Sequence, residues 1–365
     1  MKVLNLIWGF SLGAGIDKCF LTYHGLSAED SSVEVLSVCI NLKNLDSHIE
    51  PLREIGAVII DINSRKDFSW IGKLHSLILK ERPDLVFTHG FNGAIMMGIM
   101  RMFGRCHVPV VCSNHGRYTG PTPFRRLVEP MVNRLMYITY QTVAVSVICV
   151  DGSGREEVLS GGVPPDKITV VHNGIPDRTP AVAHNAVPEI ITASRISVEK
   201  GLNHLLQALA IIKDKGIPFR YRMIGEGPEL NNMKQLAGQL QLTDCVQFEG
   251  FRSDVPECLD QADIFALPSL REYHSIAVLE AMRAAKAIVA TNVGGNCESV
   301  TDECQGLIVP PADSEALAAA IERLLSDSAL RRTLGDAPRR RFVDEFTESA
   351  MKRGIINALK KAVGK

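Results

Sequence analysis

Residues 263–290, DIFALPSLREYHSIAVLEAMRAAKAIVA, contain the pattern that decides the fold. A short apolar run at 263–267 is followed by a polar loop, an amphipathic stretch at helical spacing and a second apolar run at 287–290. A strand, a helix and a strand in this order are typical of a parallel sheet covered by helices. The same alternation recurs along both halves of the chain.

The other apolar runs extend this pattern to a series of strands in each half. In the first half they are 3–7, 33–38, 57–60, 84–88, 108–113, 144–149 and 168–171, and in the second half 190–193, 219–223, 245–248, 263–267, 287–290 and 306–309. Between the halves, residues 176–189 (PDRTPAVAHNAVPE) are rich in Pro and Ala and lack periodicity, as linkers do. We therefore expect an α/β chain with two Rossmann-like domains, at 1–178 and 190–341, a linker at 179–189 and a helical end at 342–365.

One helix of the second half carries a clear start signal. Asp313 follows Pro310 and precedes an apolar stripe that includes Leu317 and Ile321. An Asp at this position accepts hydrogen bonds from the first free amides of a helix, so we expect Asp313 to be the N-cap.

Composition excludes several classes of protein. The 365 residues suggest about two domains, and 46% hydrophobic with 22% charged residues is ordinary for a globular chain, not a disordered one. Forty basic against 41 acidic residues argue against a nucleic-acid binder. The nine Cys are scattered without a CxxC pair, which indicates reduced thiols in a cytoplasmic protein.

No apolar stretch has the length of a membrane span. The most apolar one, 138–150, contains Thr139, Gln141 and Ser146 and is shorter than the roughly 20 residues that a spanning helix needs. The start of the chain, with Lys2 before VLNLIWGFSLGAG, fits a signal peptide or a buried strand that runs into a Gly-rich loop. We favour the strand, because Asn5 interrupts the apolar run.

Four segments of the second half place polar residues after predicted strands, where open α/β sheets bind ligands. Residues 194–201 carry two cations before a helix, an arrangement suited to a diphosphate or simply to a solvated turn. Residues 224–229 and 248–255 are loops in which the backbone could approach a ligand or a planar base, or simply turn. Residues 267–282 place Glu272 in a loop and Glu280 in the helix behind it, with Ser275 as the expected N-cap.

Taken together, these segments resemble the retaining glycosyltransferases of family four, which have the GT-B fold of two Rossmann-like domains that face each other across a cleft. The matching frame spans about 190–300 and consists of Arg195…Glu199-Lys200-Gly201, Gly225-Glu226-Gly227-Pro228, Val246…Gly250, Ala262-Asp263, Leu267-Pro268-Ser269, Glu272…Glu280-Ala281-Met282 and Gly294-Gly295…Glu298. The first half matches more loosely, through Gly13, Gly15, His115, Ser146 and 170–175.

The resemblance implies a nucleotide-diphosphate sugar, with UDP or GDP, as donor substrate. Arg195 and Lys200 would neutralise its diphosphate, and Glu280 would bind its ribose hydroxyls. Glu272 would bind the transferred sugar.

The remaining donor contacts are implied in the same way. The amides around Ser275 and Ile276 would hold phosphate or sugar oxygens, and His115 would line the sugar face. Loop positions complete the expected set of donor-binding residues: Gly13, Gly15, Gly225, Gly227, Phe251 and Arg252. In this family the terminal helix crosses back onto the first domain.

Two residues depart from the family pattern. Tyr273 stands where the family usually has Gly after the first Glu, so the ring reshapes the expected sugar pocket. Asp17 stands where the family often has Glu.

The residues favour a reaction that needs neither a metal nor a covalent nucleophile. The chain contains no Asp-x-Asp motif, and Arg and Lys can stabilise the leaving group without Mg²⁺. No Ser or Cys lies in a GxSxG-like frame, and we expect no cofactor. His89 and His115 both follow predicted strands; His115 is equally a catalytic candidate and a structural residue, and His89 is the weaker candidate.

The segment 101–134 is strongly basic, with six Arg against a single acid, Glu129, and with apolar residues among them. One interpretation is a surface that meets anionic lipid or a lipid-linked acceptor, so that the protein lies on the inner face of a membrane. The other is a solvated basic helix face.

We therefore predict a metal-independent, retaining glycosyltransferase that acts on a glycan or lipid-linked acceptor in polysaccharide, glycan or glycolipid biosynthesis. Two alternatives with the same fold are a nucleotide-sugar epimerase and a sugar phosphorylase. A third is a non-catalytic sugar-binding protein, against which the intact set of Arg195, Lys200, Glu272 and Glu280 argues.

Overall fold

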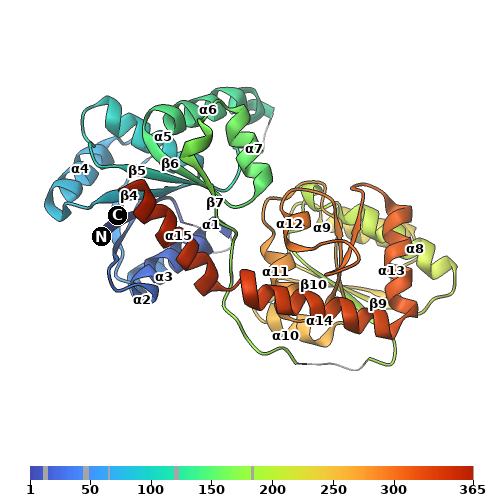
Figure 1. Cartoon of the computed structure of the whole chain (residues 1–365). Helices are drawn as coiled ribbons and strands as arrows, with labels where there is room; N and C mark the ends of the chain where they lie inside the picture. Colours follow the sequence, from blue (N-terminus) through green and yellow to red (C-terminus); the bar gives the residue numbers. More distant parts are fainter. Residues whose placement is uncertain (11–14, 44–48, 65, 119–122, 182–184, 365) are drawn as a thin grey trace. The chain divides into compact units, whose positions relative to one another are not determined.

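The structure, a computed structural model, describes residues 1–10, 15–43, 49–64, 66–118, 123–181 and 185–364. The chain divides into two compact units, and the first consists of 1–172 together with 349–365. The second unit is 173–348. Each unit is a parallel sheet with helices on its two faces (Figure 1), which confirms the predicted α/β class.

The first unit contains a seven-stranded sheet in the order β3-β2-β1-β4-β5-β6-β7. The strands are β1 (Lys2–Trp8), β2 (Glu34–Leu42), β3 (Val58–Ile62), β4 (Leu85–His89), β5 (Val110–Asn114), β6 (Ala144–Cys149) and β7 (Ile168–Val170). The helices are α1 (Gly15–His24), α2 (Leu26–Glu29), α3 (Glu50–Glu54), α4 (Ser69–Glu81), α5 (Gly90–Met102), α6 (Pro123–Thr142), α7 (Gly152–Ser160) and α15 (Glu348–Ala362).

The second unit contains a six-stranded sheet in the order β10-β9-β8-β11-β12-β13. The strands are β8 (Glu189–Ala193), β9 (Arg220–Ile224), β10 (Val246–Gly250), β11 (Ile264–Leu267), β12 (Ala287–Thr291) and β13 (Leu307–Val309). The helices are α8 (Leu202–Asp214), α9 (Leu230–Gln239), α10 (Val255–Gln261), α11 (Ile276–Arg283), α12 (Asn296–Ser299), α13 (Ser314–Ser326) and α14 (Ser328–Glu345).

Every predicted strand is present, because a parallel strand is buried on both faces and is therefore almost continuously apolar. β12, for example, is buried along its whole length. The boundaries differ by up to four residues; β2 continues to Leu42, beyond the predicted end at 38. The predicted N-cap is also confirmed, since the carboxylate of Asp313 accepts a hydrogen bond from the amide of Ala316 at 2.9 Å.

The helical end expected over 342–365 consists of two helices, α14 and α15. The break lies at Phe346 and Thr347, because the backbone there bonds to Ile175 instead of continuing the helix. The amide of Ile175 donates to the carbonyl oxygen of Phe346 at 3.1 Å, and the amide of Glu348 donates to that of Ile175 at 2.8 Å. α15 then packs within the first unit (Figure 1), where Met351, Ile355 and Leu359 are buried.

The second unit begins at residue 173, before the boundary expected at 178, so the segment 173–178 belongs to this unit. Asp177 pairs with Arg339, and Arg178 pairs with Asp260. Charged side chains of the segment are therefore tied to helices α14 and α10. Among the described residues, none of the helices combines the length and the apolar composition that a membrane crossing needs.

Candidate functional site

The strand order of the second unit changes direction between β8 and β11. From β8 the chain continues outward to β9 and β10, whereas from β11 it continues to β12 and β13 on the opposite side. Open α/β sheets bind their ligands at the carboxyl ends of strands at such a switch point. The loops that leave these two ends are 194–201 and 268–275, and both belong to segments that the sequence predicted to bind a ligand.

Backbone contacts hold these two loops together. The amides of Leu270 and Arg271 donate to the carbonyl oxygen of Glu199, at 2.7 and 3.3 Å. Gly201 has φ = +58°, and a Cβ at this position would lie 2.3 Å from the carbonyl oxygen of Pro268. Because only glycine allows this approach, residue 200 is placed directly beside the second loop.

Lys200 and Glu272 form an ion pair at the switch point. The Lys200 ammonium donates to Oε1 of Glu272, and the hydroxyl of Ser269 donates to the same oxygen at 2.7 Å. The two charged side chains are 20% and 11% exposed, so the pair is shielded but open to solvent. A ligand phosphate that binds Lys200 therefore competes with Glu272 for the ammonium. The sequence selected both charged residues but not their pairing, and it gave Ser269 no role.

Helix α11 begins directly after the second loop. Ser275 is its N-cap, as predicted, and its hydroxyl accepts a long hydrogen bond of 3.5 Å from the amide of Val278. The first amides of a helix have no acceptor within it, so the start of α11 at Ile276 offers donors to an anionic oxygen. Glu280 lies in the second turn of the same helix and is half-buried.

The chain between Glu272 and α11 is fixed by the loop that follows β12. Gly294 has φ = +51°, and a Cβ there would lie 2.0 Å from the carbonyl oxygen of Glu272. The amide of Gly295 donates to the carbonyl oxygen of Tyr273 at 3.3 Å. The Tyr273 ring, which departs from the family pattern, is paired with Arg271: Nη2 donates to its hydroxyl at 2.8 Å, and the guanidinium lies 5.5 Å from the ring centroid.

His274 anchors this segment, and the sequence gave no sign of it. The side chain is buried, and its Nε2 shares a hydrogen bond of 3.0 Å with the hydroxyl of Ser299. Its carbonyl oxygen accepts a hydrogen bond of 2.9 Å from the side-chain amide of Asn173. Neither partner is near in sequence, so no local pattern marks this residue.

Gly225 and Gly227 are needed for packing against the protein's own backbone. A Cβ on Gly225, where φ is +131°, would lie 1.9 Å from the carbonyl oxygen of Ser194. A Cβ on Gly227 would lie 2.1 Å from that of Ile196. The amide of Ile196 also donates to the carbonyl oxygen of Glu226 at 2.8 Å, so this loop supports the loop 194–201 from behind.

The other predicted donor-binding residues of the second unit differ in availability. Arg195 and Phe251 are exposed, and residue Phe251 is 74% accessible, so a base could stack on its ring. Arg252 is engaged by carboxylates: Nη1 lies 3.0 Å from Glu249 and Nε lies 2.7 Å from Asp254. Its side chain is therefore held beside its own loop.

The first unit has its switch point between β1 and β4, and two histidines lie close to it. His89 ends β4, is buried, and its Nε2 lies 2.6 Å from Oδ1 of Asn5. His115 follows β5 and its Nε2 shares a hydrogen bond of 2.9 Å with the hydroxyl of Ser113. The ring centroids of the two histidines are 6.2 Å apart.

Burial keeps both histidines neutral at physiological pH. It lowers the pKa of His115 to about 4, and burial together with the nearby His115 lowers the pKa of His89 well below its usual value of 6.5. A neutral His115 can donate or accept a hydrogen bond but carries no charge toward a phosphate. Of the other residues predicted for this unit, Gly13 lies outside the described residues, and Gly15 is the first residue of α1.

The depressed pKa values predict that the protein loses stability as the pH falls. Between pH 6.5 and about 4 the unfolded chain binds protons that the folded histidines do not, so the free energy of unfolding should decrease through this window. We expect about 1–2 kcal/mol from His115 by pH 5. Denaturant unfolding at pH 7 and pH 5 measures it: His115→Asn should reduce the pH dependence, and substitution of the exposed His107 by Asn should not. An equal pH dependence in the two variants would contradict this assignment.

Among the residues that the structure describes, no group of three or more His, Cys, Asp or Glu side chains is placed to hold a metal ion. The two loops at the switch point of the second unit carry three cations, Arg195, Lys200 and Arg271, and two carboxylates, Glu199 and Glu272. This set can bind a phosphate through its cations and hydroxyl groups through its carboxylates.

Comparison with known proteins gives relatives that match about half of the chain. It is 32% identical over 154 residues to 2-deoxystreptamine glucosyltransferase of Streptomyces kanamyceticus, covering 42% of this chain and 40% of that protein. It is 29% identical over 219 residues to the amylovoran biosynthesis glycosyltransferase AmsK of Erwinia amylovora, covering 57% and 54%. The chain thus spans only about half the length of these relatives.

Solved structures match over nearly the whole chain. HepE of Anabaena, crystallised with UDP, superposes with a TM-score of 0.81 at 19% identity, covering 99% of this chain and all of that one. The lipopolysaccharide outer core galactosyltransferase WaaB, in its apo form, gives 0.78 at 16% identity and covers 99% of both chains. At these identities the likeness shows the fold alone, which is GT-B.

Two family sequence models match in succession. Glycosyltransferase Family 4 matches residues 22–178, and Glycosyl transferases group 1 matches residues 178–341. The first match covers most of the first unit, and the second covers the switch point with Lys200, Glu272 and Glu280. By both matches, the chain belongs to the family-4 glycosyltransferases, the group 1 glycosyl transferases with the GT-B fold.

Proposed function

We propose that the protein is a retaining, metal-independent glycosyltransferase that moves a sugar from a nucleotide-diphosphate donor to a hydroxyl acceptor. The observation that carries the proposal is the ion pair of Lys200 with Glu272 beside the N-terminus of α11, at a sheet switch point. A cation and helix amides suit the diphosphate, and the carboxylate suits sugar hydroxyls.

Each group then has a separate task. Lys200 and the exposed Arg195 stabilise the negative charge that develops on the departing diphosphate. Glu272 accepts hydrogen bonds from the transferred sugar, and Glu280 accepts them from the ribose. Phe251 offers its exposed ring to the base, and His115, as a neutral imidazole, lines the sugar face.

The reaction proceeds on one face of the sugar. The bond from the anomeric carbon to the diphosphate oxygen breaks, and a new bond from that carbon to the acceptor oxygen forms. The departing phosphate oxygen takes the proton of the acceptor hydroxyl, so no carboxylate nucleophile is required. We assign no such nucleophile, and the two-carboxylate scheme of glycosidases is not needed.

The experiment that tests the proposal is an assay for the released nucleotide diphosphate. A panel of UDP- and GDP-sugars is first screened by thermal shift, where a donor at 100 times its Kd stabilises by about 2.7 kcal/mol. The bound donor is then incubated with hydroxyl acceptors such as short glycans. Release of nucleotide diphosphate with a new α- or β-glycoside of retained configuration supports the proposal. An isomerised nucleotide sugar would identify an epimerase instead, and a bound but unchanged donor would identify a binding protein.

Turnover should not depend on a divalent cation. Because Lys200 and Arg195 supply the positive charge, we expect the same rate in excess EDTA as in buffer with Mg²⁺. The same product assay measures this. Loss of activity in EDTA that Mg²⁺ or Mn²⁺ restores would overturn the assignment of the diphosphate to these two cations.

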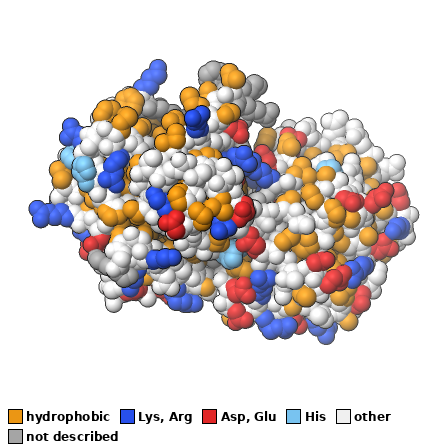
Figure 2. Space-filling view, turned by 45° about the horizontal axis from the view of Figure 1, so that its top comes forward, with side chains coloured by type: hydrophobic (Ala, Val, Ile, Leu, Met, Phe, Trp, Pro, Cys, Tyr) orange, Lys and Arg blue, Asp and Glu red, His pale blue; other side chains and the backbone are white. Residues whose placement is uncertain are grey.

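We also propose that the segment 101–134 brings the enzyme to an anionic membrane surface, where a lipid-linked acceptor would reside. Met102 and Phe103 are 72% and 59% exposed at the end of α5, next to the exposed Arg105. Figure 2 shows hydrophobic side chains and Lys or Arg side chains lying next to one another on the surface. Exposed apolar side chains beside cations are typical of proteins that lie on a membrane.

Binding to vesicles should therefore need negative charge and weaken with salt. We expect the protein to sediment with vesicles that contain phosphatidylglycerol. Binding should be lost as the ionic strength rises above about 0.15 M, where screening acts within about 8 Å. Charge reversal at Arg125 and Arg126 should also weaken binding. The side chains of these two arginines lie outside those that the structure describes, so they enter by sequence alone. Equal binding to neutral and anionic vesicles would contradict the membrane role and support the other interpretation, a solvated basic helix face.

A further inference from the structure

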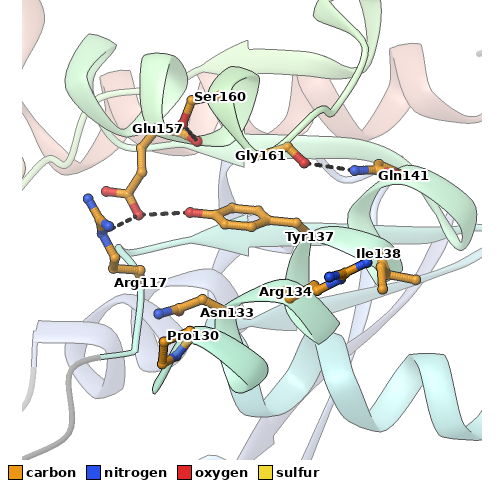
Figure 3. A pocket seen from close by; sticks show the side chains of 10 residues that line it. All are labelled: Arg117, Pro130, Asn133, Arg134, Tyr137, Ile138, Gln141, Glu157, Ser160 and Gly161. Atoms are coloured by element: carbon orange, nitrogen blue, oxygen red, sulfur yellow. Dashed lines mark hydrogen bonds and ion pairs between the residues drawn. The ribbon is translucent and has the colours of Figure 1, made fainter. Parts of the chain in front are cut away.

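A groove lies between α6 and α7 of the first unit (Figure 3), and none of the predicted donor residues is among those that line it. It has a volume of about 440 Å³. From α6 its lining residues are spaced as one face of a helix, at intervals of three and four. They are Pro130, Asn133, Arg134, Tyr137, Ile138 and Gln141, and the opposite wall is formed by Glu157, Ser160 and Gly161, with Arg117 at one end.

The walls of this groove are held in place by hydrogen bonds. The hydroxyl of Tyr137 donates to Glu157 at 3.0 Å, and the side-chain amide of Gln141 donates to the carbonyl oxygen of Gly161 at 2.7 Å. A Cβ on Gly161 would lie 2.6 Å from the Tyr137 ring, so the backbone of α7 lies directly against this ring. Nε of Arg117 lies 3.3 Å from Glu157, which neutralises that carboxylate.

Arg134 is the cation that remains available in the groove. It is exposed on α6, and it forms no ion pair or hydrogen bond with any residue that the structure describes. Glu157, the acidic residue among those lining the groove, is already paired with Arg117. The groove therefore has an excess of positive charge, and its unpaired guanidinium can form two parallel hydrogen bonds to a phosphate.

An apolar stripe runs along α6 beside the groove. Its members are spaced by four, four and three residues and are 78%, 59%, 45% and 42% exposed: Leu127, Met131, Leu135 and Ile138. At 100° per residue, the stripe and the groove occupy adjacent faces of the helix, and Arg134 and Ile138 lie at their border. When the stripe is inserted into lipid, the groove faces the layer of the headgroups.

We propose that this groove binds the phosphate of an anionic lipid headgroup, with Arg134 as its ligand, while the stripe of α6 enters the acyl boundary. The site rests on the membrane contact proposed above and is independent of sugar transfer. A headgroup bound in this groove would fix the orientation of the enzyme on the bilayer by setting its rotation about the α6 axis. Charge attraction alone does not set this orientation. The occupant is lipid, because a water-soluble phosphate would gain nothing from the four exposed apolar side chains.

The test compares substitutions that keep the charge. Arg134→Lys retains the charge but loses the paired hydrogen bonds, and we expect it to weaken binding to vesicles of phosphatidylcholine with 30% phosphatidylglycerol by about tenfold. Arg105→Lys, on the same basic segment but outside the groove, is the matched control and should change binding by less than about twofold. Equal effects of the two substitutions would show that only the summed charge acts, and would overturn the site.

Two further measurements separate the sources of the phosphate. Glycerol phosphate, titrated without vesicles and followed by NMR of Arg134, should bind only at millimolar concentration; binding as tight as that of the vesicles would identify a soluble ligand and overturn the proposal. If the protein bound no vesicle at all, the proposal would be overturned, and a partner protein would be the occupant of the stripe instead. Donor binding, measured by thermal shift on Arg134→Lys, should equal that of the parent, so a failure here is distinguishable from a failure of the proposed transferase activity.

Discussion

Lys200→Ala should lower the affinity for a nucleotide diphosphate by about 10- to 150-fold and leave the affinity for the bare nucleoside almost unchanged. The range corresponds to about 1.5–3 kcal/mol for a lost hydrogen bond to a charged group. The Lys200 side chain is 20% exposed, so little water can replace its charge at the phosphate. Calorimetry with nucleoside, nucleotide diphosphate and nucleotide sugar measures all three affinities.

Two carboxylate variants make this experiment specific. Glu280→Gln should weaken nucleoside and nucleotide diphosphate alike, because both carry the ribose. Glu272→Gln should spare the diphosphate, or even strengthen it slightly by releasing Lys200 from its ion pair, and should lower turnover with the sugar donor. The matched control is Lys213→Ala, which removes an ion pair with Asp244 elsewhere in the same unit and should leave all affinities unchanged. Parent-like binding of the diphosphate by Lys200→Ala would refute the placement of the donor.

Gly225→Ala should be among the most destabilising single substitutions in the second unit. The new Cβ would lie 1.9 Å from the carbonyl oxygen of Ser194, a distance that forces the loop 194–201 to move. We expect the free energy of unfolding to fall by more than about 3 kcal/mol, since backbone displacement adds to the conformational penalty. Folded variant protein should bind the donor poorly as well, because this loop carries Lys200.

The control for this prediction is Gly216→Ala at the end of α8. Gly216 also has a positive φ, +71°, but no atom lies within 4 Å of its Cβ position. The free energy of unfolding of this variant should fall only by the cost of placing a residue with a Cβ in the left-handed region, about 1–2 kcal/mol. Chemical denaturation of both variants compares the two effects. If the two variants lost similar free energy of unfolding, the close contact of the new Cβ with Ser194 would cost nothing, which would contradict the prediction.

The sequence predicted the sheets well because parallel strands are marked by local composition. Strands such as β6 and β12 are short apolar runs with helices between them, and their burial on both faces allows few other patterns. The N-caps Asp313 and Ser275 were predictable for a similar reason, since the capping side chain and the amide it serves lie three residues apart.

Features that depend on distant segments were not predictable. The break between α14 and α15 is caused by Ile175, which lies far from it in sequence, so the composition of 342–365 could not reveal it. The pairing of Lys200 with Glu272 joins positions 72 residues apart. The sequence also suggested a ligand role for Gly225 and Gly227, whereas the close approach that each permits is to the backbone of the loop 194–201.

The position of α15 sets the order in which the protein can be completed during synthesis. Its side chains Met351, Ile355 and Leu359 belong to the same hydrophobic cluster as Val3 and Phe87. A ribosome therefore makes the whole second unit, at about 5–20 residues per second, before it makes the α15 side chains that complete this cluster. Until then the residues of the first unit that pack against α15 lack this apolar cover.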